Sequence, residues 1–175
     1  MKETISVLIP EKEIDKRLNE MVETISSDFK GKTITIIGVL KGSVMLMVDI
    51  AKKLKQPVEF DFIDISSYGE GLTSSGNIKI NKDIENSIEG KYVLLVEDII
   101  DSGRTLNYLL NYLKSKKPAS LKVCTLLDKP ERRVFDISVN YIGFEIPDEF
   151  VVGYGLDYAQ KYRNLPYIGT LEIEE

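Results

Sequence analysis

The chain has 175 residues, a length typical of one globular domain. Hydrophobic residues make up 43% and charged residues 29%, which is the composition of an ordinary soluble globular protein. No apolar run approaches the ~20 residues that a membrane-spanning helix needs, so we expect no membrane segment. The net charge of −5 argues against binding to nucleic-acid phosphates and favours small-molecule ligands or protein partners.

The absence of histidine excludes a wide range of chemistry. With no histidine in the chain, Ser-His-Asp hydrolysis, Cys-His nucleophiles and His-ligated zinc are ruled out. Cys124 is the one cysteine, which excludes an internal disulfide and a multi-cysteine zinc site. The single cysteine, and the lack of an apolar signal core behind Met1, predict a cytoplasmic location. Any chemistry must come from carboxylates, Lys, Arg, hydroxyls, backbone amides or a hard cation.

Predicted helices and strands alternate along the chain. Apolar residues after Pro10 recur at helical spacing up to Phe29, and Gly31 ends this helix. Residues 33–40 are β-branched and apolar, which is typical of a strand buried on both faces. The remaining predicted elements are a helix that Ser43 can cap, a strand from Pro57 to Ile65, a strand at 91–96, a helix carrying Leu106 to Leu113, and strands at 120–127, 138–144, 150–154 and 166–171.

This alternation predicts an α/β fold, with a mostly parallel twisted sheet flanked by helices. In such sheets ligands bind beyond the carboxyl ends of the strands. A polar stretch from Ser66 to Asn77 contains three glycines and several hydroxyl residues, so we expect a flexible loop there.

The segment after the strand ending in Val96 carries the most chemistry. It reads EDIIDSGRT from Glu97 to Thr105, and three carboxylates so close together are costly unless a cation or hydroxyl groups meet them. The hydroxyls, the glycine and the free amides of a helix N-terminus then suit a phosphate group. An acidic pair beside a phosphate loop predicts a ribose 5-phosphate ligand with Mg²⁺ nearby. The plainer alternative is that Asp101 and Ser102 only cap the helix.

Residues 93–105 (VLLVEDIIDSGRT) resemble the motif with which type I phosphoribosyltransferases bind phosphoribosyl diphosphate (PRPP). Leu40-Lys41-Gly42, Ser67-Tyr68-Gly69 and residues 143–158 (GFEIPDEFVVGYGLDY) resemble the hypoxanthine-guanine phosphoribosyltransferases in particular. The likeness extends from about residue 5 to residue 171. It implies the type I phosphoribosyltransferase fold and a purine salvage reaction. In that reaction, the phosphoribosyl group of PRPP moves to N9 of hypoxanthine or guanine, giving inosine or guanosine monophosphate and pyrophosphate.

The resemblance also implies residue roles. Asp101 matches the catalytic residue that accepts the proton from purine N7. The implied PRPP- and phosphate-binding residues are Glu97, Asp98, Asp101, Ser102, Gly103, Arg104 and Thr105, although the family often has Lys where Arg104 stands. The implied pyrophosphate-binding residues are Lys41, Gly42, Ser67, Tyr68 and Arg163. The implied purine-binding residues are Lys129, Phe150, Val151 and Asp157. The implied cofactor is Mg²⁺, with Glu97, Asp98 and Asp157 as its ligands. In this family the peptide bond between Leu40 and Lys41 can be cis.

The likeness implies a single phosphoribosyltransferase domain over residues 1–175. Within it we expect a flexible lid loop at about 66–77, and a small hood built mainly from the N-terminal few residues and about 140–175. The implied partners are PRPP and the 6-oxopurines hypoxanthine and guanine, with xanthine left open, and neither nucleic acid nor a membrane. Family members are usually dimers or tetramers, so a homodimer or homotetramer is expected.

Other interpretations explain less of the sequence. A phospho-acceptor receiver domain carries its acidic pair after the first strand, whereas Glu97-Asp98 follows a later one. An RNA-binding regulator with the same fold needs a basic face, and the net charge of −5 argues against it. Gly31-Lys32-Thr33 resembles a P-loop ending, but Ser26 stands where the first glycine is required. We interpret Arg132-Arg133 as a short charged turn.

Overall fold

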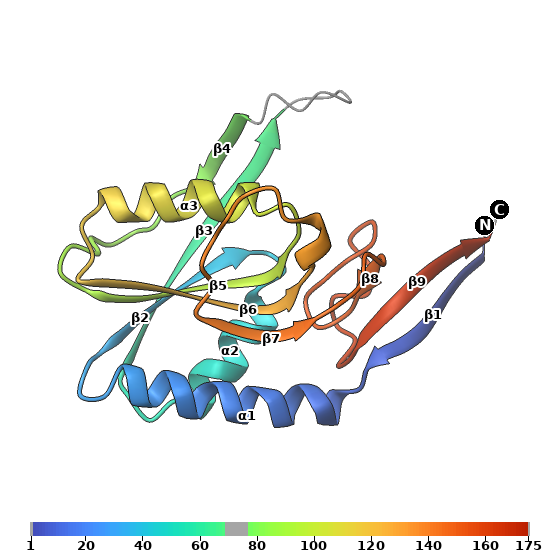
Figure 1. The fold of residues 1–175 in the computed structure, drawn as a ribbon, viewed down its shortest axis with the longest axis horizontal. Coiled ribbons are helices and arrows are strands. Elements are labelled where there is room, and N and C mark those ends of the chain that lie inside the picture. Colours follow the sequence, from blue (N-terminus) through green and yellow to red (C-terminus); the bar gives the residue numbers. More distant parts are fainter. Residues whose placement is uncertain (1, 69–76, 175) are drawn as a thin grey trace.

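The computed structural model describes residues 2–68 and 77–174, and its centre is a twisted sheet (Figure 1). Within the described residues this sheet has six strands in the order β4-β3-β2-β5-β6-β7. The strands are β2 (Ile34–Leu40), β3 (Val58–Tyr68), β4 (Asn77–Lys82), β5 (Tyr92–Ile100), β6 (Ser120–Asp128) and β7 (Tyr141–Glu145). All neighbouring pairs are parallel except β3 and β4. The predicted mostly parallel α/β fold is confirmed.

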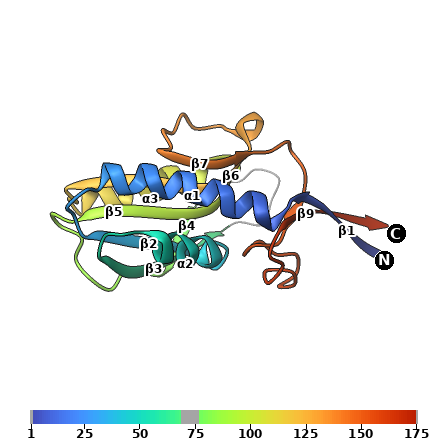
Figure 2. The same cartoon turned by 90° about the horizontal axis from the view of Figure 1, so that it is seen from below.

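Helices cover both faces of this sheet (Figures 1 and 2). On one face, α1 (Glu11–Asp28) and α2 (Val44–Lys53) pack on Leu94 and Val96 of β5. On the other face, α3 (Arg104–Ser115) packs on Val93 and Leu95 of the same strand. A strand with apolar residues on both faces must be covered twice, which explains its continuous hydrophobic run. None of the helices in the described ranges is long and apolar enough to cross a membrane.

A second, smaller sheet joins the two ends of the described chain. It contains β1 (Lys2–Ile9), β9 (Ile168–Glu174) and β8 (Val151–Val152), which are antiparallel and in that order. Figure 1 shows β1 and β9 side by side, projecting from the main body. β1 is not predicted from the sequence, because half of its eight residues are exposed and backbone pairing with β9 forms it.

Several element boundaries differ from the predictions. β5 continues beyond Val96 to Ile100, because it keeps pairing with β6 as far as Asp128, so the acidic pair lies inside the strand and not after it. β3 likewise extends through residues 66–68 of the predicted lid, and residues 69–76 lie outside the described residues. Ser43 stands before α2 but donates its hydroxyl to the Val39 carbonyl oxygen at 2.7 Å, so its side chain does not cap the helix.

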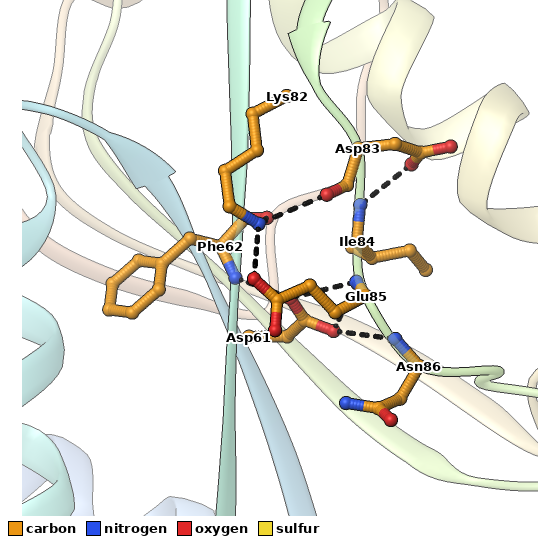
Figure 3. A network of polar contacts seen from close by, with 7 residues as sticks. All are labelled: Asp61, Phe62, Lys82, Asp83, Ile84, Glu85 and Asn86. Atoms are coloured by element: carbon orange, nitrogen blue, oxygen red, sulfur yellow. Dashed lines mark hydrogen bonds and ion pairs between the residues drawn. The ribbon is translucent and has the colours of Figure 1, made fainter.

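The β3–β4 hairpin, which carries the predicted lid segment, is fixed at its base by a buried carboxylate (Figure 3). Asp61 accepts hydrogen bonds from the backbone N–H of Phe62 at 2.8 Å, of Glu85 at 2.9 Å and of Asn86 at 3.2 Å. Lys82 adds an ion pair to Glu85 at 3.1 Å. These bonds hold the chain between β4 and β5 against β3.

Candidate functional site

A cavity of about 290 Å³ lies at the carboxyl edge of the sheet, where β5 leads into α3. Residues of this one segment make up much of its lining: Glu97, Asp98, Ile99, Ile100, Asp101, Ser102, Gly103, Thr105 and Leu106. Val39, Ile65, Ser66 and Ile78 complete the wall. The structure therefore brings the acidic pair and the predicted phosphate loop into one cavity, at the edge where parallel sheets bind ligands.

The loop between β5 and α3 has the shape of an anion-binding turn. Gly103 has a φ of +81°, and a side chain there would come within 2.9 Å of Ile137. Both facts favour glycine at this position. The Ser102 carbonyl oxygen accepts a hydrogen bond from the Val134 N–H at 3.0 Å, which fixes the loop to the chain after β6. α3 begins at Arg104, and the amides of a first helical turn have no carbonyl partner within the helix, so they can bind a phosphate.

At the floor of this site Glu97 is buried and Asp98 is partly buried. Burial raises the pKa of Glu97 well above its ordinary value, and the negative charge of Asp98 raises it further. Burial also raises the pKa of Asp98, although the nearby Arg163 guanidinium acts in the opposite direction. Asp98 Oδ1 accepts a hydrogen bond from the Ile99 N–H at 2.7 Å, which orients the carboxylate. Two adjacent carboxyls with little access to solvent are stabilised by hydroxyl donors or by a cation.

The turn after β2 packs directly against the acidic pair. The peptide bond between Leu40 and Lys41 is cis, an isomer that the sequence left open. A Cβ atom at Gly42 would lie 1.6 Å from Asp98 Oδ2, so no other residue fits without displacing that carboxylate. A Cβ atom at Gly155 would in turn lie 2.0 Å from the backbone oxygen of Gly42. Two glycines thus allow three backbone segments to meet at one carboxylate.

The loop after β8 adds positive charge beside this turn. Arg163 donates to the Gly155 carbonyl oxygen at 2.7 Å and pairs with Asp157 Oδ1 at 2.8 Å. Lys41 Nζ lies 3.4 Å from Gln160 Oε1 in the same loop. The fold therefore brings two distant parts of the sequence together on one side of the acidic pair: Lys41 and Gly42 from the turn after β2, and Asp157 and Arg163 from the loop after β8.

A magnesium ion fits the acidic pair better than it fits all three predicted ligands together. Within residues 2–68 and 77–174, no three His, Cys, Asp or Glu side chains lie close enough to hold a metal ion jointly. Asp157 already binds Arg163 through Oδ1 and the Gln160 N–H through Oδ2, at 2.9 Å. Mg²⁺ commonly binds to one or two carboxylates and completes its coordination with water and substrate phosphates. Glu97 and Asp98 can supply those two carboxylates.

Ser67 and Tyr68 are the last two residues of β3, where they pair with Ile78 and Asn77 of β4. Their neighbour Ser66 lines the cavity, and so does Ile78. The end of the hairpin therefore adjoins the site. Gly69, which follows Ser67 and Tyr68, lies outside the described residues.

Lys129 is buried, although a loop lysine is usually solvated. Its backbone N–H donates to the Ile100 carbonyl oxygen at 2.9 Å, so the chain after β6 is fixed to the end of β5. Its side chain is 10% exposed, and Nζ donates to the Glu149 carbonyl oxygen at 2.7 Å. Asp148 Oδ1 lies 3.4 Å from the same ammonium group. This arrangement directs an ammonium group toward the segment that contains Phe150.

Phe150 and Val151 differ sharply in burial. Phe150 is 55% exposed, and its ring meets that of Tyr158 edge-on, with ring centroids 5.8 Å apart. Val151 is buried and begins β8. An exposed ring next to a fixed strand can stack on a planar ligand.

Arg132 and Arg133 do more than form the short charged turn that was predicted, because both make ion pairs. The two residues lie at the 3₁₀ turn η1 (Pro130–Arg132). Arg132 Nε lies 2.6 Å from Asp101 Oδ1, and Nη1 lies 3.0 Å from Asp148 Oδ2. Arg133 makes a largely buried pair with Asp128 at 2.9 Å. No spacing in the sequence signals these pairs, because Arg132 reaches Asp101 only through the fold.

A mostly parallel sheet with an anion-binding loop at its carboxyl edge is typical of α/β proteins that bind phosphorylated ligands. The family description "Phosphoribosyl transferase domain" matches residues 10–159. The chain belongs to this family and, within it, to the hypoxanthine(-guanine) phosphoribosyltransferases.

Similar proteins support that placement. The hypoxanthine phosphoribosyltransferase of Salmonella typhimurium is 50% identical, with 99% of this chain and 98% of that protein covered. A crystal structure of a hypoxanthine-guanine phosphoribosyltransferase from Bacillus anthracis superimposes with a TM-score of 0.91 at 46% identity, covering 98% of this chain and 100% of that one. The bifunctional protein TilS/HprT of Listeria monocytogenes is 51% identical over 96% of this chain, which spans only 26% of that longer relative.

Proposed function

We propose that this chain is a purine salvage enzyme that transfers the 5-phosphoribosyl group of PRPP to N9 of hypoxanthine or guanine. The products are inosine or guanosine monophosphate and pyrophosphate. The observation that carries the proposal is the shared cavity, which the acidic pair and the anion-binding loop line together. The names of the full-length relatives support the choice of purine.

The acidic pair and the loop bind the two ends of the sugar. Glu97 and Asp98 accept hydrogen bonds from the ribose hydroxyls, and the amides of residues 102–105 bind the 5-phosphate. Positive charge develops on the sugar as its bond to the diphosphate breaks, and the carboxylates stabilise it. Lys41 and Arg163 meet the negative charge of the departing diphosphate, with Gly42, Ser67 and Tyr68 beside it. The protein contributes position and fixed charge more than covalent chemistry.

The purine lies between Asp101 and Phe150. Asp101 is half exposed at the cavity and accepts the proton of N7 as N9 attacks the sugar. Lys129 donates to the 6-oxo group, Phe150 stacks on the rings, and the backbone of Val151 contacts the base edge. Asp157, in the loop after β8, completes the set of purine-binding residues.

We further propose Mg²⁺ as the cofactor, held by Glu97 and Asp98, with Asp157 oriented toward the diphosphate side. When bound, Mg²⁺ supplies neutralising charge at the diphosphate. The small sheet of β1, β9 and β8 serves as the hood over the site, and residues 66–77 serve as the lid. We place the protein in the cytoplasm, as a homodimer or homotetramer.

The proposal is tested by assaying PRPP with adenine, hypoxanthine, guanine, xanthine and uracil, with and without Mg²⁺. We expect pyrophosphate release with hypoxanthine and guanine, and only when Mg²⁺ is present. Adenine is expected to fail because its 6-amino group cannot accept a hydrogen bond from Lys129. Equal turnover of adenine, or no turnover with any 6-oxopurine, contradicts the proposal.

Substituting Phe150 with alanine is expected to raise the KM for hypoxanthine by about tenfold to a hundredfold, because a base-stacking ring is lost. The KM for PRPP and the melting temperature should change little, since the ring is largely exposed. Steady-state kinetics with each substrate varied in turn provide the measurement. Phe60→Ala is the matched control, because Phe60 is 53% exposed and belongs to β3, outside the lining of the cavity. An unchanged hypoxanthine KM in Phe150→Ala shows that the ring does not contact the purine.

A further inference from the structure

Four side chains of alternating charge form a continuous chain along the purine side of the site. Asp101 Oδ1 lies 2.6 Å from Arg132 Nε, and Arg132 Nη1 lies 3.0 Å from Asp148 Oδ2. The other oxygen of Asp148 lies 3.4 Å from Lys129 Nζ. Arg132 is one of the two inner members, and it contacts the carboxylate assigned to proton transfer.

The fold sets the position of Arg132 from both sides. Its backbone N–H donates to the Lys129 carbonyl oxygen at 3.1 Å, which closes the turn η1. Two residues further on, the Val134 N–H donates to the Ser102 carbonyl oxygen at 3.0 Å and so fixes this segment to the phosphate loop. Arg133, between them, is anchored by its largely buried pair with Asp128. The guanidinium therefore projects from a turn that is bonded at both ends, even though the side chain itself is 51% exposed.

We propose that Arg132 is a positioning residue for the reaction: it orients the Asp101 carboxylate toward purine N7 and couples that carboxylate to the segment that carries Phe150. The inference rests on the proposed function. Arg132 reaches Asp101 through Nε and Asp148 through Nη1, so one rigid, planar group spans the two carboxylates. Asp148 is next to Glu149, whose carbonyl oxygen binds Lys129, so the contact extends to the group assigned to the 6-oxo atom.

The charge arrangement is consistent with this role. Hydrogen bonding to Arg132 lowers the pKa of Asp148 below its usual range, with Lys129 adding to the effect. Asp148 therefore stays ionised as the second anchor of the guanidinium at neutral pH. An Arg held between two carboxylates keeps its geometry better than one that pairs with a single mobile partner.

The test is a double-mutant cycle on turnover, with wild type, Arg132→Gln, Asp101→Asn and the double variant. Arg132→Gln is expected to lower kcat by about tenfold to a hundredfold, with a change in hypoxanthine KM of less than about threefold. If Arg132 acts through Asp101, the double variant is no slower than Asp101→Asn alone, within about twofold. A wild-type kcat in Arg132→Gln, or additive losses in the double variant, overturns the inference.

Two further variants separate positioning from a structural effect. Glu131→Gln changes an exposed charge in the same turn and is expected to keep wild-type kcat and melting temperature. Arg132→Lys restores charge but not the planar two-point contact, so it should recover only part of the lost turnover. Full recovery by Lys shows that charge alone matters, and it contradicts a positioning role. Wild-type protein that turns over no purine rejects the proposed function and this inference together, whereas an active wild type with an additive cycle rejects only the inference.

Discussion

Asp101→Asn is expected to lower kcat a few hundredfold while PRPP affinity and the melting temperature stay close to wild type. Asparagine has nearly the same shape but cannot accept a proton, and loss of a general base typically costs about 10²–10⁴ in rate. The side chain is half exposed, so its replacement leaves little buried polarity unsatisfied. Turnover with saturating hypoxanthine and PRPP, together with PRPP binding by calorimetry, provides the measurement.

Asp148→Asn is the matched control for this variant, because Asp148 also pairs with Arg132 at 3.0 Å. It removes a carboxylate from the same network without removing the assigned proton acceptor. Its loss of turnover should be clearly smaller than that of Asp101→Asn. Equal losses of turnover in the two variants would assign the loss to the charge of the network and contradict proton transfer to Asp101. Near-normal turnover in Asp101→Asn would contradict it as well.

Gly42→Ala is expected to lower kcat/KM for PRPP by about a hundredfold or more. The added methyl group would lie 1.6 Å from Asp98 Oδ2, so either the carboxylate or the turn after β2 must move. A displacement of about 1 Å in a positioning group can cost about 10² in rate. Kinetics with PRPP varied at saturating hypoxanthine measure the effect.

Gly31→Ala is the control for Gly42→Ala. Gly31 has a φ of +74°, but a Cβ atom there meets nothing within 4 Å. Alanine at this position should cost some stability through its backbone conformation and leave kcat/KM unchanged. A Gly42→Ala variant that binds and uses PRPP normally would show that Asp98 tolerates displacement and is not a fixed ligand of the sugar.

Most of the main sheet and its helices could be predicted from sequence, because hydrophobic periodicity reports burial directly. α1 shows this well, since its buried residues recur at helical spacing. β1 could not be predicted in the same way, because its partner β9 lies at the other end of the chain. The extension of β5 was missed for a related reason. Polar residues look like the end of a strand, yet pairing with β6 continues through the acidic pair to Ile100.

The same limit applies to the site. Residues 97–105 are contiguous, so their type and order indicate an acidic pair and a phosphate loop without a structure. Arg132 carries no such signal, because its contact with Asp101 depends on the 3₁₀ turn after β6. Gly155 is similar, since its closeness to the backbone of Gly42 arises only when the loop after β8 folds onto the turn after β2. The sequence alone therefore predicts the contiguous ligand-binding segment 97–105. The contacts that Arg132 and Gly155 make with the site can be found only from the tertiary structure.

The most direct test is a crystal structure of the chain with PRPP and Mg²⁺. We predict that the ribose hydroxyls lie within hydrogen-bonding distance of Glu97 and Asp98, and that the 5-phosphate lies on the backbone amides of residues 102–105. Electron density for PRPP at another surface, or an empty loop at a PRPP concentration that saturates turnover, would contradict the account.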